Sequence, residues 1–169
     1  MPQRNVPRLL VMSCSARKFE ERTRRPAYLL YDGPAFQLLR KYLAGRGYGA
    51  PGSSYPTGSL AAPDLTVMIV SAKYGPVPLG NMIEWYDKKL TMGEAIIEKN
   101  LGRWSLALNR HCRIYNPTDG FFHGGIAYKS AVPVTSWQTP GLHVTLSAGG
   151  QGQQLSQLKT WLEKGGTID

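Results

Sequence analysis

The segment LLVMSCSARK, residues 9–18, is an apolar run that ends in small polar side chains and then becomes basic. Cys14 and Ser15 follow the apolar residues, and Arg17 and Lys18 come next. Small hydroxyl groups and backbone amides can hold an anionic group, and the two cations would neutralise its charge. The Cys14 thiol could act as a nucleophile beside these cations, or it could simply fill space at a strand end. The segment therefore predicts a polar turn after a buried strand.

The segment LTVMIVSAKYG, residues 65–75, repeats this design. Ser71 ends the apolar run, and Lys73 follows it. Lys73 could contact a ligand or could be a solvated residue at a strand end. Tyr74 could stack on a base, or it could cover the edge of a sheet. Gly75 is expected to adopt a positive φ, which glycine reaches without strain.

A third polar turn is expected at His123, Gly124 and Gly125, which follow the short apolar stretch DGFF. The histidine could bind a base or a phosphate, or it could act as a general acid–base group. A structural role is the alternative for a histidine before two glycines.

Carboxylates occur near these turns in the segment MIEWYD, where Glu84 and Asp87 flank Tyr86. Glycosyl chemistry needs a carboxylate that acts as nucleophile or base, or that stabilises a cation-like transition state. Asp87 could instead cap a turn or pair with Lys88. These residues are the candidate catalytic groups.

The elements that must position these turns alternate between strands and helices along the chain. Strands are expected at residues 7–13, at 65–71, at the start of 119–132 and at 141–147. Helices are expected at residues 33–47, at 92–111, at the end of 119–132 and at 149–166. This alternation predicts a single α/β domain over residues 1–169, with three layers and a mainly parallel sheet. Ligands of such sheets bind outside the carboxyl ends of the strands, so the three turns should converge on one pocket.

The remaining segments are expected to be loops. Residues 14–32 form a basic connector, residues 48–63 form a loop rich in Gly, Pro and Ser, and residues 75–90 carry the carboxylates. Within the helix expected at 92–111, the apolar side chains Ile96, Leu101, Trp104 and Leu108 can face inward, and Gly102 is a weak point.

The composition favours an anionic partner. The net charge is +9 and the sequence pI is about 9.7, so nucleic acid or a phosphorylated small molecule is the natural expectation, although the surplus cations could serve solubility alone. No apolar run approaches the roughly 20 residues that span a bilayer, and no secretory apolar core follows the N-terminus. We therefore expect no membrane partner and a cytoplasmic location, with Cys14 and Cys112 as free thiols.

Metal and cofactor motifs are absent from the sequence. It has no C-x-x-C and no H-x-x-x-H, so we expect no metal site. Its glycines form neither a Walker loop nor G-x-G-x-x-G in a strand–helix context, so we expect no nucleotide cofactor. The sequence does not indicate an oligomeric state.

Taken in order, the motifs resemble those of a family of small bacterial and phage domains. The motifs are Cys14-Ser15-x-x-Lys18, LYDGPAF, SAKYG, IEWYD and HGGIAY, and the resemblance spans roughly residues 9–163. The family is distantly similar to the peroxide-stress YaaA proteins and to the Cys-Ser-x-x-Lys domain of archaeosine synthase, and its phage members are often labelled queuine tRNA-ribosyltransferase-like. The resemblance implies an α/β fold and a role around nucleic acids or modified bases, with 7-deazaguanine chemistry as the best-known case. Site residues implied in this way are Cys14, Ser15, Lys18, Ser71, Lys73, Tyr74, Gly75, Glu84, Tyr86, Asp87, Gly125 and Tyr128.

Three functional hypotheses follow. The first is an enzyme that cleaves or exchanges an N-glycosidic bond of a nucleobase or nucleoside. Asp87 or Glu84 would act at the reacting sugar, and Tyr74 or Tyr86 would stack on the base. The phosphate would be held by Arg17, Lys18 and Lys73. The alternative is a non-catalytic protein that binds or sequesters nucleic acid or a nucleotide, as a phage protein could. A weaker hypothesis is an interaction protein whose basic segment 17–25 docks an acidic partner.

Overall fold

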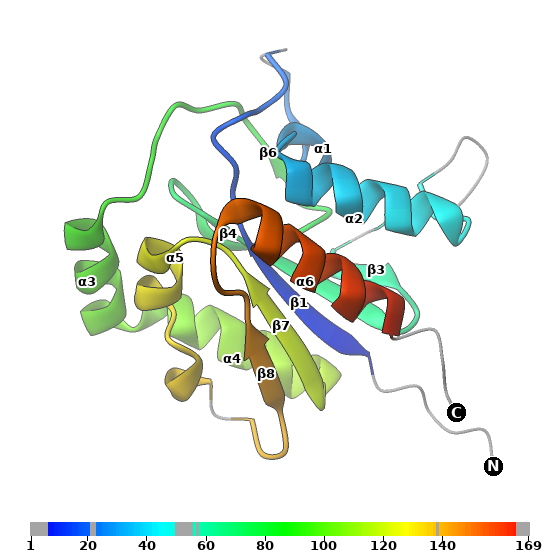
Figure 1. Ribbon diagram of the computed structural model, residues 1–169. Helices are drawn as coiled ribbons and strands as arrows, with labels where there is room; N and C mark the ends of the chain where they lie inside the picture. The colour runs from blue at the N-terminus through cyan, green and yellow to red at the C-terminus, as the bar shows by residue number, and fades with distance from the viewer. Residues whose placement is uncertain (1–6, 21–22, 50–55, 57, 138, 165–169) are drawn as a thin grey trace.

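The computed structural model describes residues 7–20, 23–49, 56, 58–137 and 139–164. The strands are β1 (Arg8–Ser13), β2 (Arg25–Pro26), β3 (Leu60–Ala62), β4 (Leu65–Ser71), β5 (Gly75–Pro78), β6 (Met82–Ile83), β7 (Asp119–His123) and β8 (His143–Leu146). The helices are α1 (Ala27–Leu30), α2 (Pro34–Gly45), α3 (Met92–Leu101), α4 (Arg103–Tyr115), α5 (Ile126–Ala131) and α6 (Gln151–Lys164), with a 3-10 turn at Val134–Ser136. The prediction of an α/β fold with a mainly parallel sheet is confirmed (Figure 1).

The main sheet has the strand order β3-β4-β1-β7-β8. β1 pairs in parallel with β4 on one side and with β7 on the other, and β7 pairs in parallel with β8. β3 and β5 are the antiparallel strands, and both pair with β4. The carboxyl ends of β4, β1 and β7 therefore reach the same edge of the sheet, where ligands of parallel sheets bind.

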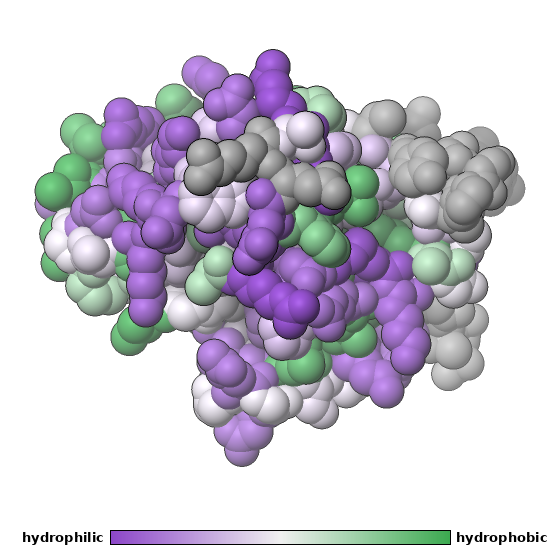
Figure 2. All heavy atoms as spheres, turned by 90° about the horizontal axis from the view of Figure 1, so that it is seen from above, coloured by the Kyte–Doolittle hydropathy of each residue, from purple (hydrophilic) through white to green (hydrophobic). Residues whose placement is uncertain are grey.

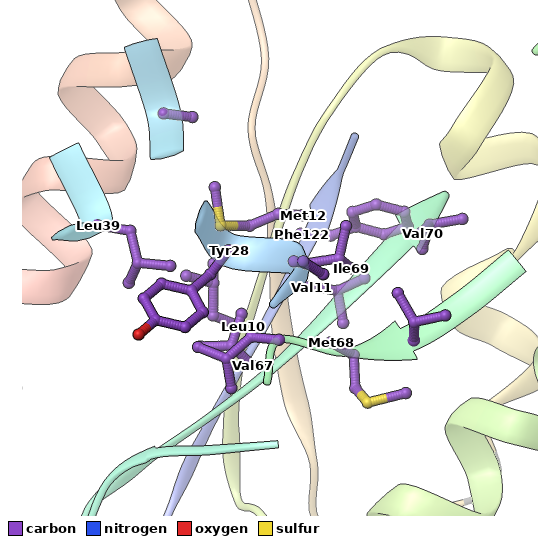
Figure 3. Packing of buried hydrophobic residues seen from close by; sticks show 14 of the residues in the cluster. Leu10, Val11, Met12, Tyr28, Leu39, Val67, Met68, Ile69, Val70 and Phe122 are labelled. Atoms are coloured by element: carbon purple, nitrogen blue, oxygen red, sulfur yellow. The ribbon is translucent and has the colours of Figure 1, made fainter. Parts of the chain in front are cut away.

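Apolar runs in the central strands form the core. All seven residues of β4 and the four central residues of β1 are buried. Continuous apolar runs of this kind are typical of parallel strands that are covered on both faces. Figure 3 shows Val11 and Met12 of β1 close to Ile69 and Val70 of β4 and to Phe122 of β7. This packing holds the strand ends in fixed positions.

Some segments predicted as loops contain short strands and a helix. The basic connector 14–32 includes β2 and α1, and β2 pairs in an antiparallel manner with β6 from the segment 75–90. The predicted loop 48–63 includes β3, while its residues 50–55 and 57 lie outside the described part of the chain. Two-residue and three-residue strands depend on their partner strands, so the sequence carries too little local pattern to predict them.

The helix predicted at 92–111 is two helices. Gly102 has a φ of 69° and ends α3, and its N–H donates to the Glu98 carbonyl oxygen. A capping box of Thr91 and Glu94 starts α3. α4 begins immediately after Gly102 and continues to Tyr115, beyond the predicted end.

The prediction of which side chains of this region are buried is correct for α4 and wrong for α3. Trp104 and Leu108 of α4 are buried, whereas Ile96 and Leu101 of α3 are exposed. Only Ala95 of α3 is buried, and the helix is in contact with α5. In the described residues, no helix is long and apolar enough to cross a membrane.

His111 of α4 generates a prediction about stability. Its Nε2 lies 3.0 Å from Thr66 Oγ1 of β4, and burial lowers its pKa to about 4. The unfolded chain has an ordinary histidine pKa of about 6.5, so between these values the unfolded state binds more protons. The free energy of unfolding should therefore fall by about 1.4 kcal/mol per pH unit for this histidine as the pH drops from about 6.5 towards 4.

His111→Gln should make the decline with acid shallower, measured by urea unfolding at a series of pH values. The control is His143→Gln, since His143 is exposed on β8. An equal acid slope in His111→Gln and the unmodified protein would contradict the prediction.

Candidate functional site

A cavity of about 590 Å³ lies at the carboxyl ends of the parallel strands. The ends of β1 and β7 line it, together with the first turns of two helices. The helix residues that line it are Gly33, Pro34, Ala35 and Phe36 at the start of α2, and Gln151, Gly152, Gln154 and Leu155 in α6. The cavity is thus where the sequence analysis expected a ligand.

The structure brings together six of the predicted site residues in the wall of this cavity. They are Cys14, Ser15, Arg17, His123, Gly124 and Gly125. The turns after β1 and β7 therefore converge as expected. The turn after β4 does not line the cavity but lies beside it, joined through side chains described below.

Close approaches of glycine backbone shape the cavity wall. A Cβ atom at Gly124 would lie 2.6 Å from Ser13 Oγ, and one at Gly33 would lie 2.7 Å from Ser15 Cβ. Ser15 Oγ accepts a hydrogen bond from the Gly33 N–H at 3.1 Å and donates to the Arg17 carbonyl oxygen at 2.6 Å. These contacts tie the turn after β1 to the start of α2.

Asp32 stabilises the same part of the cavity wall through ion pairs. Its side chain is buried and forms ion pairs with Arg17 Nε at 3.1 Å and with Arg40 Nη2 at 2.6 Å. The sequence analysis did not include Asp32 among the site residues. The available signal was its position directly before Gly33 and Pro34, because proline at the first helical position marks the start of a helix.

A cluster of phenol groups lies beside the cavity, at the end of β4. Tyr86 Oη is 2.7 Å from both Tyr31 Oη and Ser71 Oγ. Ser71 Oγ also accepts hydrogen bonds from the backbone N–H groups of Lys73 and Tyr74. Ser71 therefore fixes both the turn after β4 and the orientation of Tyr86.

Cys14 joins this cluster to the cavity. Its Sγ lies 3.2 Å from Tyr128 Oη, and it also lines the cavity. Burial is the main cause that raises the pKa of Tyr31, Tyr86 and Tyr128, so all three phenols are neutral near pH 7. We call Tyr31, Tyr74, Tyr86 and Tyr128 the tyrosine cluster.

The predicted cations sit on the outer side of the tyrosine cluster. Lys18 Nζ lies 4.5 Å from the centre of the Tyr86 ring, and Lys73 Nζ lies 5.1 Å from the centre of the Tyr74 ring. Tyr74 meets Tyr86 edge to face, with ring centres 5.6 Å apart. Both lysines thus lie along the same edge as the cavity without lining it.

His123 is a neutral group in the cavity wall. Burial, followed by the nearby Lys129 charge, lowers its pKa to about 4. Its Nδ1 is buried without a hydrogen-bond partner among the described residues. Lys129 Nζ donates to the Ser147 carbonyl and hydroxyl oxygens, and Ser147 Oγ donates to Gln154 Oε1 at 2.9 Å. A neutral imidazole can offer one donor or one acceptor to a ligand.

The predicted catalytic carboxylates lie elsewhere. Glu84 and Asp87 are exposed, and neither lines the cavity. They follow β6, whose chain turns Tyr86 inward and these two residues outward. Gly75 has the expected positive φ, at 70°, and a Cβ there would lie 2.6 Å from Trp104 Nε1.

The electrostatic setting of the cavity favours an anion. The N-terminal ends of α2 and α6 border it, and neither helix has an acidic residue in its first turn. A helix N-terminus carries a partial positive charge that attracts anions. Among the described residues, no group of His, Cys, Asp and Glu side chains is placed to hold a metal ion.

Sequence reasoning missed the residues that α6 and α1 bring to the site. Gln151 and Gln154 line the cavity, and Tyr31 joins the tyrosine cluster. Glutamine is common in exposed helices, and nine tyrosines are present in the chain, so residue type alone could not single these out.

Comparisons with known proteins add no relative. No protein-family model matches the chain, and no significant match was found among curated proteins or solved structures. The resemblance given in the sequence analysis therefore stays a prediction.

Gly124→Ala tests the close approach in the cavity wall. The added Cβ would meet Ser13 Oγ, so we expect a loss of about 1–3 kcal/mol in the free energy of unfolding. The matched control is Gly152→Ala, which also lines the cavity but meets no atom within 4 Å. Because alanine favours a helix, this control should be as stable as the unmodified protein or more so. Equal stability of both variants in urea unfolding would contradict the described packing.

Proposed function

We propose that this protein binds a small anionic ligand of the nucleotide class in the cavity at the carboxyl ends of the parallel strands. The observation that carries the proposal is the convergence of β1, β7 and the N-termini of α2 and α6 on one cavity. A phosphate group would lie against the helix N-termini, where backbone N–H groups and the helix dipoles favour it.

The rest of such a ligand has suitable surroundings. A volume of about 590 Å³ lies within the usual range of about 300–1,000 Å³ for small-molecule sites. Phe36 and Leu155 supply apolar wall, and His123 and Gln154 supply polar groups that could recognise a base. The net charge of +9 supports an anionic ligand as well.

We also propose two finer properties of the protein. We retain the three-layer arrangement, supported by the contact between α2 and α6 and by the contact of α4 with β5. We also propose a reducing, cytoplasmic location, because Cys14 and Cys112 are both free thiols.

Cleavage or exchange of an N-glycosidic bond, as in 7-deazaguanine base exchange, is the function that the structure supports less well. That chemistry needs a carboxylate at the reacting sugar. Glu84 and Asp87 are exposed and outside the cavity wall, and the buried Asp32 is occupied by two arginines. Non-catalytic binding therefore fits the geometry better.

Ligand binding can be tested by calorimetry with guanosine 5′-monophosphate, guanosine and inorganic phosphate. We expect the nucleotide to bind more tightly than either part alone. Gly152→Phe should weaken binding at least about tenfold, because its ring would occupy the cavity, whereas Gly152→Ala should bind like the unmodified protein.

Two results would contradict the proposal. One is the absence of binding for all three compounds, and the other is equal binding by the Phe and Ala variants.

Incubation of a guanosine nucleotide with the protein, followed by chromatography for released base, tests the enzyme hypothesis. Turnover that is lost in Asp87→Asn while binding persists would favour the enzyme over the binder.

A further inference from the structure

We propose that the surface beside the cavity binds single-stranded nucleic acid and that the cavity receives one nucleotide of that strand. This inference rests on the proposed function and adds the substrate class. The surface, called the aromatic rim below, consists of exposed rings and neighbouring cations. Its members are Phe19, Tyr74 and Trp85, with Lys18, Lys73, Arg24 and Arg25.

The exposed aromatic residues belong to segments that meet at Tyr86: Trp85 precedes it in the chain, the Tyr74 ring contacts its ring, and Phe19 follows Lys18, whose Nζ lies 4.5 Å from the centre of the Tyr86 ring. Among the described residues, Phe19, Tyr74 and Trp85 are the exposed Phe, Tyr and Trp side chains, at 41%, 38% and 36%. Exposed large side chains elsewhere, including those of α3, α4 and α5, are aliphatic or methionine. The rim therefore differs in chemistry from the other exposed apolar surface of the protein.

Cations lie on the rings of the rim or next to them. Arg25 and Arg40 lie 5.4 Å and 5.9 Å from the centre of the Phe19 ring, and Lys73 lies 5.1 Å from that of Tyr74. Arginine planes and aromatic rings both stack on bases, and the charges attract the phosphates between them.

The rim is continuous with the cavity. Arg17 lines the cavity, and the next residue, Lys18, has its Nζ 4.5 Å from the centre of the Tyr86 ring, which contacts the ring of Tyr74. In the other direction, β2 pairs with β6, and Arg24 Nη2 donates to the Met82 carbonyl oxygen, three residues before Trp85. A single nucleic-acid strand could therefore follow the aromatic rim and place one of its nucleotides in the cavity.

The view from above in Figure 2 is towards this edge of the molecule. Hydrophilic side chains cover much of that face, and hydrophobic ones lie at its left margin, on the side where Figure 1 shows α3, and in smaller groups near its centre. A duplex keeps its bases stacked inside and could not use the rings, so the rim suits unpaired bases.

Fluorescence anisotropy with a labelled oligothymidylate of about 12 nucleotides tests the inference, since one binding groove covers about 4–16 nucleotides. Tyr74→Ala and Trp85→Ala should each weaken binding by about 5- to 100-fold, which is the usual loss for a stacking residue. Lys73→Ala should reduce the slope of log affinity against log salt by about 0.7. Binding of guanosine 5′-monophosphate should be unchanged in all three variants.

The matched controls are Ile97→Ala for an exposed apolar residue on α3 and Lys159→Ala for an exposed cation on α6. Both should bind the oligonucleotide like the unmodified protein. Trp85 supplies a second readout, because the oligonucleotide should quench its fluorescence and Trp85→Leu should lose that quenching.

Several outcomes would overturn the inference. One is equal affinity for a duplex of the same length, and another is unchanged oligonucleotide binding in the Tyr74 and Trp85 variants. A third is displacement of the oligonucleotide by polyglutamate at equal charge, which would indicate an acidic protein partner. Failure of the mononucleotide to bind, with intact oligonucleotide binding, would instead overturn the proposed function and leave only the rim.

Discussion

Parallel pairing of β1 with β4 and β7 is the constraint on which the whole site depends. These strands are hydrogen-bonded neighbours in one direction, so the residues that follow them must lie at one edge of the sheet. Leu9 to Met12 are completely buried, and a shift of the strand by one residue would move the partly exposed Arg8 or Ser13 into one of these buried positions. Hydrophobic burial thereby determines where Cys14 and His123 lie, although neither contributes much to it.

The turns after the strands are held by close contacts between polar groups. Ser15, Ser71 and Ser147 each form a hydrogen bond with a backbone or side-chain group of a neighbouring segment. The neutral His123 imidazole lies in the cavity wall and the neutral phenols lie beside the cavity, while Lys18 and Lys73 lie against the tyrosine rings. The site thus combines neutral hydrogen-bonding groups with positive charge along the same edge of the sheet.

The sequence was informative where a pattern is local, and uninformative where tertiary contacts decide. The strand predicted at 65–71 has the bounds of β4. Of the three turns predicted to converge on one pocket, those after β1 and β7 line the cavity, and the turn after β4 lies beside it. Tyr31 could not be found, because its burial depends on α1, a helix of four residues without its own periodic pattern. Asp32 had one local signal, its position before Gly33 and Pro34 at the start of α2. The outward position of Glu84 and Asp87 likewise follows from the β2–β6 pair, which no local pattern indicates.

Alkylation of Cys14 tests most directly whether α6 and the end of β1 face one cavity. Iodoacetamide labelling, followed by mass spectrometry, can compare Gly152→Phe with Gly152→Ala, and the fully buried Cys112 serves as an internal reference for unfolding. The described geometry predicts that the phenylalanine ring shields Cys14 and slows its labelling several-fold, while Cys112 stays unlabelled in both variants. Equal rates of Cys14 labelling in the two folded variants would contradict the shared cavity.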